Sequence, residues 1–287
     1  MKLSTTLRLC FILIASQLLV GCGSTGNFNT SASPNTAALN GNWLLEGNNQ
    51  LSQYPFLSLA LIVDGSQITA NGEMTVPCSN SPGSFVGGGF ELIGVVNSDG
   101  SFHLSEFNLP GLLGSSSIQL AIDGSAPASG SSTWTGTYSF TDLAGYTYCI
   151  VNLTAPFTAT GLAPLNATYA GTLTGTSGNV NVSSTIAQGA GISLPGPLGT
   201  IDSYLPLTAT ITVSGSPCFT HGTSNGSADN QIGGDFALVD FTMDDGSQVL
   251  LESWLSTPDE SKIYPATLVA IGGNCNQNSY AGTLTRQ

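Results

Sequence analysis

Residues 132–140 read STWTGTYSF, and large apolar residues alternate with hydroxylated residues along this segment. In an extended chain, successive side chains point to opposite faces, so the segment has one apolar face and one hydroxylated face. The apolar face carries Trp134, Gly136, Tyr138 and Phe140, and the other face carries Thr133, Thr135, Thr137 and Ser139. Residues 207–215, LTATITVSG, repeat the alternation. A period of two predicts half-buried β-strands rather than helices.

The rest of the chain contains further short segments of the same character, separated by turn sequences. The additional predicted strands are Leu59–Val63, Ile68–Val76, Phe90–Val96, Phe102–Phe107, Ile118–Ile122, Tyr146–Leu153, Phe236–Met243 and Val249–Trp254. Asn-Gly and Asp-Gly pairs tolerate the positive φ angles of tight hairpins. Such pairs occur at Asp64-Gly65, Asn71-Gly72, Asp99-Gly100, Asp123-Gly124 and Asp245-Gly246. We therefore predict an all-β protein built from antiparallel meanders.

Two parts of the chain share landmarks in the same order. LNGNW begins at Leu39 and LNATY begins at Leu165, 126 residues later (165 − 39). Cys149 and Cys275 have the same offset of 126 residues (275 − 149). Between them, GGGFELIGVVNSDGS (87–101) is matched by GGDFALVDFTMDDGS (233–247) at a larger offset. This pattern predicts two diverged copies of one β domain, at residues 39–162 and 163–287.

Each predicted meander must close on itself or stack against a second sheet to protect its edges. GNW at Gly41–Trp43 is similar to the glycine-x-tryptophan opening of lipocalins, and TWTGTY (133–138) is similar to strands of avidin-like proteins. These resemblances imply a small β-barrel, closed or partly open, for each copy. The second copy departs from the pattern, with ATY at Ala167–Tyr169. A two-sheet β-sandwich is the alternative architecture.

The N-terminus has the organisation of an export signal. Lys2 and Arg8 precede an apolar run from Leu9 to Val20, which is too short to span a bilayer. The run ends in Leu19-Val20-Gly21-Cys22, which resembles the lipobox of bacterial lipoproteins. The resemblance implies that residues 1–21 are a cleaved signal peptide, and that Cys22 carries diacylglycerol and an acyl chain such as palmitate. It also implies a cell-envelope location, at the outer membrane if the host has two, because Gly23 replaces the aspartate of inner-membrane retention.

The predicted mature chain is strongly acidic but carries few charges. Lys262 and Arg286 are its only lysine or arginine residues, against 17 acidic residues, which gives a formal charge of −15 (2 − 17). This composition excludes nucleic acid as a partner, because phosphate binding requires a cationic surface. Charged residues make up 7% of the chain, so its surface must be Ser, Thr, Asn and Gly. Residues 22–38 are small and polar, and we interpret them as a flexible lipidated tether.

Four cysteines remain after Cys10 leaves with the signal and Cys22 is assigned to lipid. Disulfides persist outside the cytoplasm, and each predicted copy has one early and one late cysteine. We therefore predict the pairs Cys78–Cys149 and Cys218–Cys275. No two of these cysteines have the close spacing of metal ligands, so we predict neither a metal site nor a cofactor.

Candidate catalytic and binding residues are few. Residues 222–226, GTSNG, follow His221 and match the serine-hydrolase elbow, but no helix follows as that elbow requires. His103 lies in a predicted strand. Five acidic residues could offer oxygen ligands to calcium, although a solvated hairpin is the favoured interpretation: Asp235, Asp240, Asp244, Asp245 and Glu252. Trp43, Trp134 and Trp254 are assigned to the core in preference to a ligand cavity.

The sequence therefore favours a non-enzymatic binding or interaction module, tethered to a bacterial envelope membrane through Cys22. A small apolar ligand inside each barrel is one version of this hypothesis. A glycan or envelope-protein partner on the Thr/Ser-rich faces is another. The alternatives are an envelope hydrolase that uses dispersed carboxylates, and a structural coat component.

The lipid assignment predicts that Cys22→Ser will release the protein from membranes, because a single unacylated polypeptide tether provides no membrane affinity. Fractionation of cells that express the wild type and the variant would measure this. Continued membrane association of the variant through its folded domains would contradict the lipid assignment.

Overall fold

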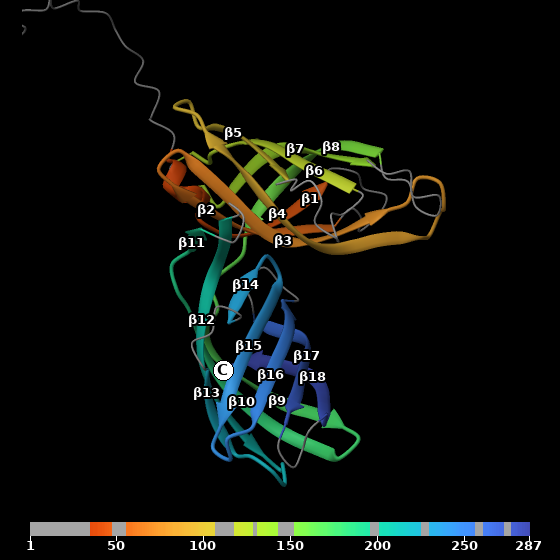
Figure 1. The fold of residues 1–287 in the computed structure, drawn as a ribbon, viewed down its shortest axis with the longest axis vertical. Coiled ribbons are helices and arrows are strands. Elements are labelled where there is room, and N and C mark those ends of the chain that lie inside the picture. Colours follow the sequence, from red (N-terminus) through yellow and green to blue (C-terminus); the bar gives the residue numbers. More distant parts are fainter. Residues whose placement is uncertain are drawn as a thin grey trace, which may run out of the picture. The chain divides into compact units, whose positions relative to one another are not determined.

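The computed structural model describes residues 35–47, 56–106, 118–128, 131–142, 152–195, 201–224, 230–255, 261–272 and 277–287. Almost all of these residues lie in β-strands or in the turns that join them (Figure 1). The strands form two closed antiparallel barrels of eight strands each. The all-β prediction and the prediction of a small β-barrel for each copy are confirmed, whereas the β-sandwich alternative is wrong. Two closed barrels also fit the resemblance to lipocalin-like proteins.

The first barrel is a simple up-and-down ring in which each strand pairs with the next. Its strands are β1 (Gly41–Gly47), β2 (Phe56–Asp64), β3 (Gln67–Pro77), β4 (Phe85–Val96), β5 (Ser101–Glu106), β6 (Ile118–Ser125), β7 (Thr133–Asp142) and β8 (Asn152–Gly161). Pairing of β1 with β8, from Trp43 opposite Gly161 to Gly47 opposite Phe157, closes the ring. A 3-10 helix, η2 (Thr36–Leu39), precedes β1 and buries Leu39 completely.

The second barrel follows the same up-and-down order, with two short strands added. Its ring consists of β9 (Asn166–Gly175), β10 (Gly178–Gln188), β12 (Ile201–Ser214), β13 (His221–Ser224), β15 (Phe236–Met243), β16 (Gln248–Leu255), β17 (Lys262–Ile271) and β18 (Ser279–Arg286). Pairing of β9 with β18 joins the first strand to the last. The short strand β11 (Ile192–Pro195) pairs with β12, and β14 (Gln231–Gly233) pairs with both β12 and β15.

Three of the five predicted glycine turns are confirmed, and two are wrong. Gly65, Gly100 and Gly246 follow aspartates at hairpin turns and have φ angles of 62°, 83° and 80°. Asn71-Gly72 and Asp123-Gly124 instead lie within strands β3 and β6. At these two positions a side chain would collide with neighbouring atoms, so the glycine is needed for its small size and not for a positive φ. A Cβ atom at Gly72 would lie 2.0 Å from the backbone oxygen of Ser58, and one at Gly124 would lie 2.5 Å from the ring of Phe102.

Aromatic side chains fill part of the first barrel's interior. Trp134 is 3% exposed, and its ring packs edge-on against Trp43, Phe102 and Phe157, with centroid distances of 5.9, 5.3 and 5.1 Å. The indole N–H of Trp43 donates a hydrogen bond of 2.7 Å to the carbonyl oxygen of Leu39, which holds η2 against the barrel. The assignment of Trp43 and Trp134 to the core is confirmed. The side chain of Trp254 lies outside the described residues.

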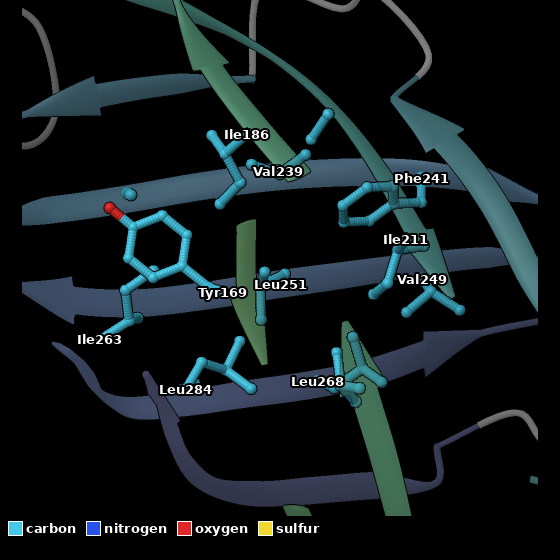
Figure 2. Packing of buried hydrophobic residues seen from close by; sticks show 14 of the residues in the cluster. Tyr169, Ile186, Ile211, Val239, Phe241, Val249, Leu251, Ile263, Leu268 and Leu284 are labelled. Atoms are coloured by element: carbon cyan, nitrogen blue, oxygen red, sulfur yellow. The ribbon is translucent and has the colours of Figure 1, made fainter. Parts of the chain in front are cut away.

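Aliphatic side chains dominate the interior of the second barrel (Figure 2). The labelled residues come from strands all around the ring and point toward one another: Tyr169, Ile186, Ile211, Val239, Phe241, Val249, Leu251, Ile263, Leu268 and Leu284. Each is at most 2% exposed. An eight-stranded barrel is just wide enough for side chains to fill its interior. Each interior is therefore filled by the side chains of its own barrel, and Ala60 on β2 of the first barrel joins the second cluster from outside.

The two barrels do not place all shared landmarks at equivalent positions. The opening landmarks, LNGNW and LNATY, lead into the first strand of each ring, β1 or β9. The DGS turn, however, joins the fourth and fifth strands of the first ring (β4 and β5) but the fifth and sixth of the second (β15 and β16). The second ring therefore has one more strand before this turn and one fewer after it. Common ancestry of the two copies stays a prediction.

The close approach of β2 to β3 predicts that Gly72→Ala will destabilise the protein. Its new methyl group has no space beside Ser58, and overpacking of this kind typically costs about 1–3 kcal/mol. Urea unfolding of the mature chain would measure the loss. Gly88→Ala is the matched control on β4, because a Cβ atom there meets no atom within 4 Å. Equal stability of the two variants would contradict the packing described for Gly72.

Candidate functional site

The outer wall of the first barrel is covered where strands β2 and β3 face the second barrel. Ser58, Ala60 and Ile62 alternate with the core residues of β2, so they point outward, yet they are 0%, 0% and 5% exposed. Their cover comes from segments that join strands of the second barrel. A Cβ atom at Gly191, just before β11, would lie 2.8 Å from Ile62, and one at Gly234, just after β14, would lie 2.4 Å from the Ser58 hydroxyl. We call this contact region the junction.

Polar groups at the centre of the junction bind one another directly. The hydroxyl of Ser58 donates a short hydrogen bond to Oδ1 of Asp235, and the backbone N–H of Asp235 lies 3.2 Å from the same hydroxyl oxygen. The N–H of Gly234 donates a 3.2 Å hydrogen bond to Oδ1 of Asn42 on β1. The turn between β14 and β15 is thus fixed to two strands of the first barrel.

Two carboxyl groups at the junction have unusual acidity. Burial raises the pKa of Asp235 above its ordinary value of 3.8, while the hydrogen bond from Ser58 opposes that rise. Burial also raises the pKa of Glu73 on β3, and the nearby charge of Asp235 adds to the increase. Both effects disfavour the ionised forms. The junction therefore raises the pH at which these two carboxyl groups lose their protons.

A small pocket lies beside these carboxyl groups. It has a volume of about 150 Å³ and is lined by Asn71, Gly72, Glu73, Gln231, Gly233, Phe236 and Leu238. Pockets for drug-sized organic ligands usually measure about 300–1,000 Å³, so this one is below that range.

A larger groove lies on the outer wall of the second barrel, with a volume of about 440 Å³. Two cross-strand rows on β9, β10 and β12 form it: Ala170, Ser183 and Thr212 in one, and Thr172, Asn181 and Ser214 in the other. The hydroxyl of Thr172 donates a 2.7 Å hydrogen bond to Oδ1 of Asn181. The groove offers hydroxyl and carboxamide groups and no charge.

The five acidic residues proposed as calcium ligands occupy different parts of the second barrel. Asp235 lies at the junction, Asp244 and Asp245 lie in the β15–β16 turn, and Asp240 and Glu252 lie on those two strands. The hydroxyl and backbone N–H of Thr220 bind Asp244 and lower its pKa to about 2. Asp245 accepts hydrogen bonds from the backbone and hydroxyl of Ser247, which lower its pKa. Among the described residues, no group of three or more His, Cys, Asp or Glu side chains could hold a metal.

The serine-hydrolase match does not correspond to an elbow in the structure. His221–Ser224 form strand β13, and the Ser224 hydroxyl accepts a 2.9 Å hydrogen bond from the N–H of Ala209. Nδ1 of His221 lies 3.2 Å from Oδ2 of Asp244. His103 makes a 2.7 Å contact with Asp123 on the surface of the first barrel, where their side chains are 60% and 64% exposed.

Cys78 and Cys218 are disulfide-bonded in the structure. Each follows the third strand of its ring, β3 or β12. Cys149 and Cys275 lie outside the described residues, so the two predicted pairings stay predictions. In the sequence they fall between the seventh and eighth strands. In an up-and-down barrel, the connection after strand three and the connection after strand seven lie at the same end, so the predicted disulfides would cross one end of each ring.

The predicted signal peptide, Cys22 and residues 23–34 also lie outside the described residues, so the lipid anchor stays a prediction. In the part of the chain that the structure describes, no helix is long and apolar enough to cross a membrane.

Comparisons with known proteins give little further information. No family model matches the chain, and no curated protein matches it. Among solved structures, the chain is similar to HpuA from Kingella denitrificans, which was determined in complex with human haemoglobin. The two are 12% identical, the match covers 85% of this chain and 94% of that one, and the TM-score is 0.18. A likeness at this TM-score supports no conclusion about fold or function.

Sequence reasoning missed the junction, including Ser58 and Glu73. One signal could have revealed it. Residues 56–63, FLSLALIV, contain a single polar residue, whereas a strand with one solvated face should alternate. A continuous apolar run indicates a strand that is covered on both faces, and β2 is such a strand.

The shared position of Cys78 and Cys218 in their rings predicts that non-reducing peptide mapping will recover the pairs Cys78–Cys149 and Cys218–Cys275. Digestion of the mature protein, followed by mass spectrometry with and without reductant, would identify the linked peptides. A linkage between the two barrels, such as Cys78 with Cys218, would contradict the pairing.

Proposed function

We propose that this protein is a lipid-anchored component of a bacterial cell envelope that binds a neutral glycan through the outer groove of its second barrel. The groove formed by β9, β10 and β12 is the observation that carries this proposal. The anchor rests on the lipobox at residues 19–22, with Cys22 as the lipidated residue. The envelope location follows from the same motif.

The filled interiors favour binding on an outer face over binding inside a barrel. Trp43, Trp134 and Phe157 pack against one another in the first barrel, and aliphatic side chains meet in the centre of the second. An apolar ligand would have to displace these residues. Such displacement loses the packing that stabilises the barrel.

The chemistry of the groove favours an uncharged, hydroxylated partner. Exposed Ser183 and Thr212 can donate and accept hydrogen bonds, as the hydroxyl groups of a sugar do. The predicted mature chain carries a formal charge of −15 (2 − 17), so an anionic polymer would be repelled. Ala170 has a short side chain, so its row of the groove leaves room for a sugar ring.

The proposed role is non-catalytic. The described histidines pair with Asp123 and Asp244, and neither pairs with Glu73 or Asp235, the two carboxyl groups whose pKa values are raised among the described residues. Asp235 is 9% exposed, and its Oδ1 accepts a hydrogen bond from Ser58. Asp235 does not line the neighbouring 150 Å³ pocket, so Glu73 alone of this pair lines it, whereas glycoside hydrolysis uses two carboxyl groups.

The groove assignment predicts that the mature chain, made soluble by Cys22→Ser, binds neutral oligosaccharides, and that Ser183→Glu weakens this binding at least tenfold, about 1.4 kcal/mol. The glutamate would fill the row between Ala170 and Thr212 and bury a charge against the sugar. A panel of immobilised neutral oligosaccharides followed by calorimetric titration would measure it.

Thr135→Glu is the matched control, because Thr135 is an exposed threonine on the outer face of β7 in the other barrel. This variant should bind as the wild type does. Failure of every neutral oligosaccharide to bind, or equal weakening by both substitutions, would overturn the proposal.

A further inference from the structure

The junction holds two acidic side chains and no base. Glu73 comes from β3 of the first barrel, and Asp235 comes from the turn that precedes β15 of the second. The elements packed here are β1, β2, β3, β4, β11, β12, β14 and β15, and none contains a lysine, arginine or histidine. Their other ionisable residues are Glu46, Asp64, Glu91, Asp202, Tyr204 and Asp240. These elements therefore contain no cationic residue that could balance negative charge at the junction.

Asp235 makes one of the hydrogen bonds that join the two barrels, and the hydroxyl groups of Thr69 on β3 and Ser193 on β11, 3.3 Å apart, make another. Oδ1 of Asp235 accepts the hydrogen bond from Ser58, and its neighbour Gly234 donates to Asn42. Nδ2 of Asn42 is buried without a hydrogen-bond partner, so the polar interactions at this position are incompletely satisfied even when the barrels are in contact. An additional unbalanced charge here would weaken polar interactions that are already incompletely satisfied.

We propose that the junction is a proton-sensitive latch, which holds the two barrels together while the Glu73–Asp235 pair carries at least one proton and loosens when both carboxyl groups ionise. This inference goes beyond the proposed glycan binding and does not depend on it, because the groove on β9, β10 and β12 lies outside the junction.

The direction of the pH effect follows from linkage. The pKa values of Asp235 and Glu73 are raised in the docked state above their ordinary values of 3.8 and 4.5. The docked state therefore binds protons more tightly than a state in which the junction is open. Docking is strongest below these ordinary pKa values, and it weakens as the pH rises through the raised pKa values. Each unit of difference in pKa changes the equilibrium between docked and open states about tenfold.

Amide hydrogen exchange of the soluble mature chain between pH 4 and pH 8 tests the latch, after correction for the intrinsic pH dependence of exchange. Peptides that contain Gly234 and Asp235, whose backbone N–H groups donate across the junction to Asn42 and Ser58, should lose protection as the pH rises. Peptides from the barrel cores, such as Val239–Phe241, should keep theirs. Loss of protection in the cores as well would indicate global unfolding and would overturn the proposal.

The double variant Asp235→Asn, Glu73→Gln should keep the junction protected across the whole pH range, because neither side chain can ionise. Asp245→Asn is the matched control, since it removes one negative charge from an exposed turn of the second barrel and should leave the wild-type pH dependence intact. Retention of the wild-type pH dependence by the double variant would overturn the proposal, as would protection in the wild type that does not change with pH.

Two glycine variants provide a second test if the double variant folds poorly, because one of them should open the junction at every pH. Gly234→Ala places a methyl group against Ser58, so the junction peptides should lose protection at every pH while the barrel cores retain it. Gly246→Ala carries the same strain of a positive φ, at 80°, but meets no atom within 4 Å. It should leave the junction protected. Full protection of the junction in Gly234→Ala would contradict the contacts from which the latch is inferred.

Discussion

Each barrel depends on the pairing of its first strand with its last. A meander of half-buried strands leaves two edges with unpaired backbone groups, and these edges invite association with other chains. The pairing of β1 with β8, and of β9 with β18, removes both edges within each ring. Closure also determines which residues form the core, because alternate side chains of every strand must then fill a narrow interior. The Thr/Ser-rich outer walls follow from the same alternation.

A second level of organisation lies outside the rings, in the segments that connect strands of the second barrel. Gly191 and Gly234 bring these segments against the wall formed by β2 and β3. There a buried carboxyl group, Asp235, replaces the apolar contact that a domain interface normally uses at its centre. The junction therefore combines close backbone packing with a group whose charge depends on the solution. The barrels themselves contain no comparable arrangement among their described core residues.

Much of this architecture could be predicted from alternation and turn chemistry. The period of two in STWTGTYSF gave the strand class, and Asp64-Gly65, Asp99-Gly100 and Asp245-Gly246 marked real hairpins. The same dipeptide rule was wrong for Gly72 and Gly124, because a glycine that makes room for a neighbouring chain is identical in sequence to one that turns the backbone. The junction could not be predicted from local patterns, since Ser58 and Asp235 are 177 residues apart and meet only after both rings have closed.

Strand β2 has a consequence for any attempt to divide the protein. Both of its faces are covered, one by the first barrel's own core and the other by the second barrel. If the first barrel were produced alone, Ala60 and Ile62 would meet water beside an otherwise hydroxylated wall. Two such copies would bury that strip most readily against each other. The isolated first barrel would therefore be a self-associating species, and the smallest well-behaved unit of this protein is the pair.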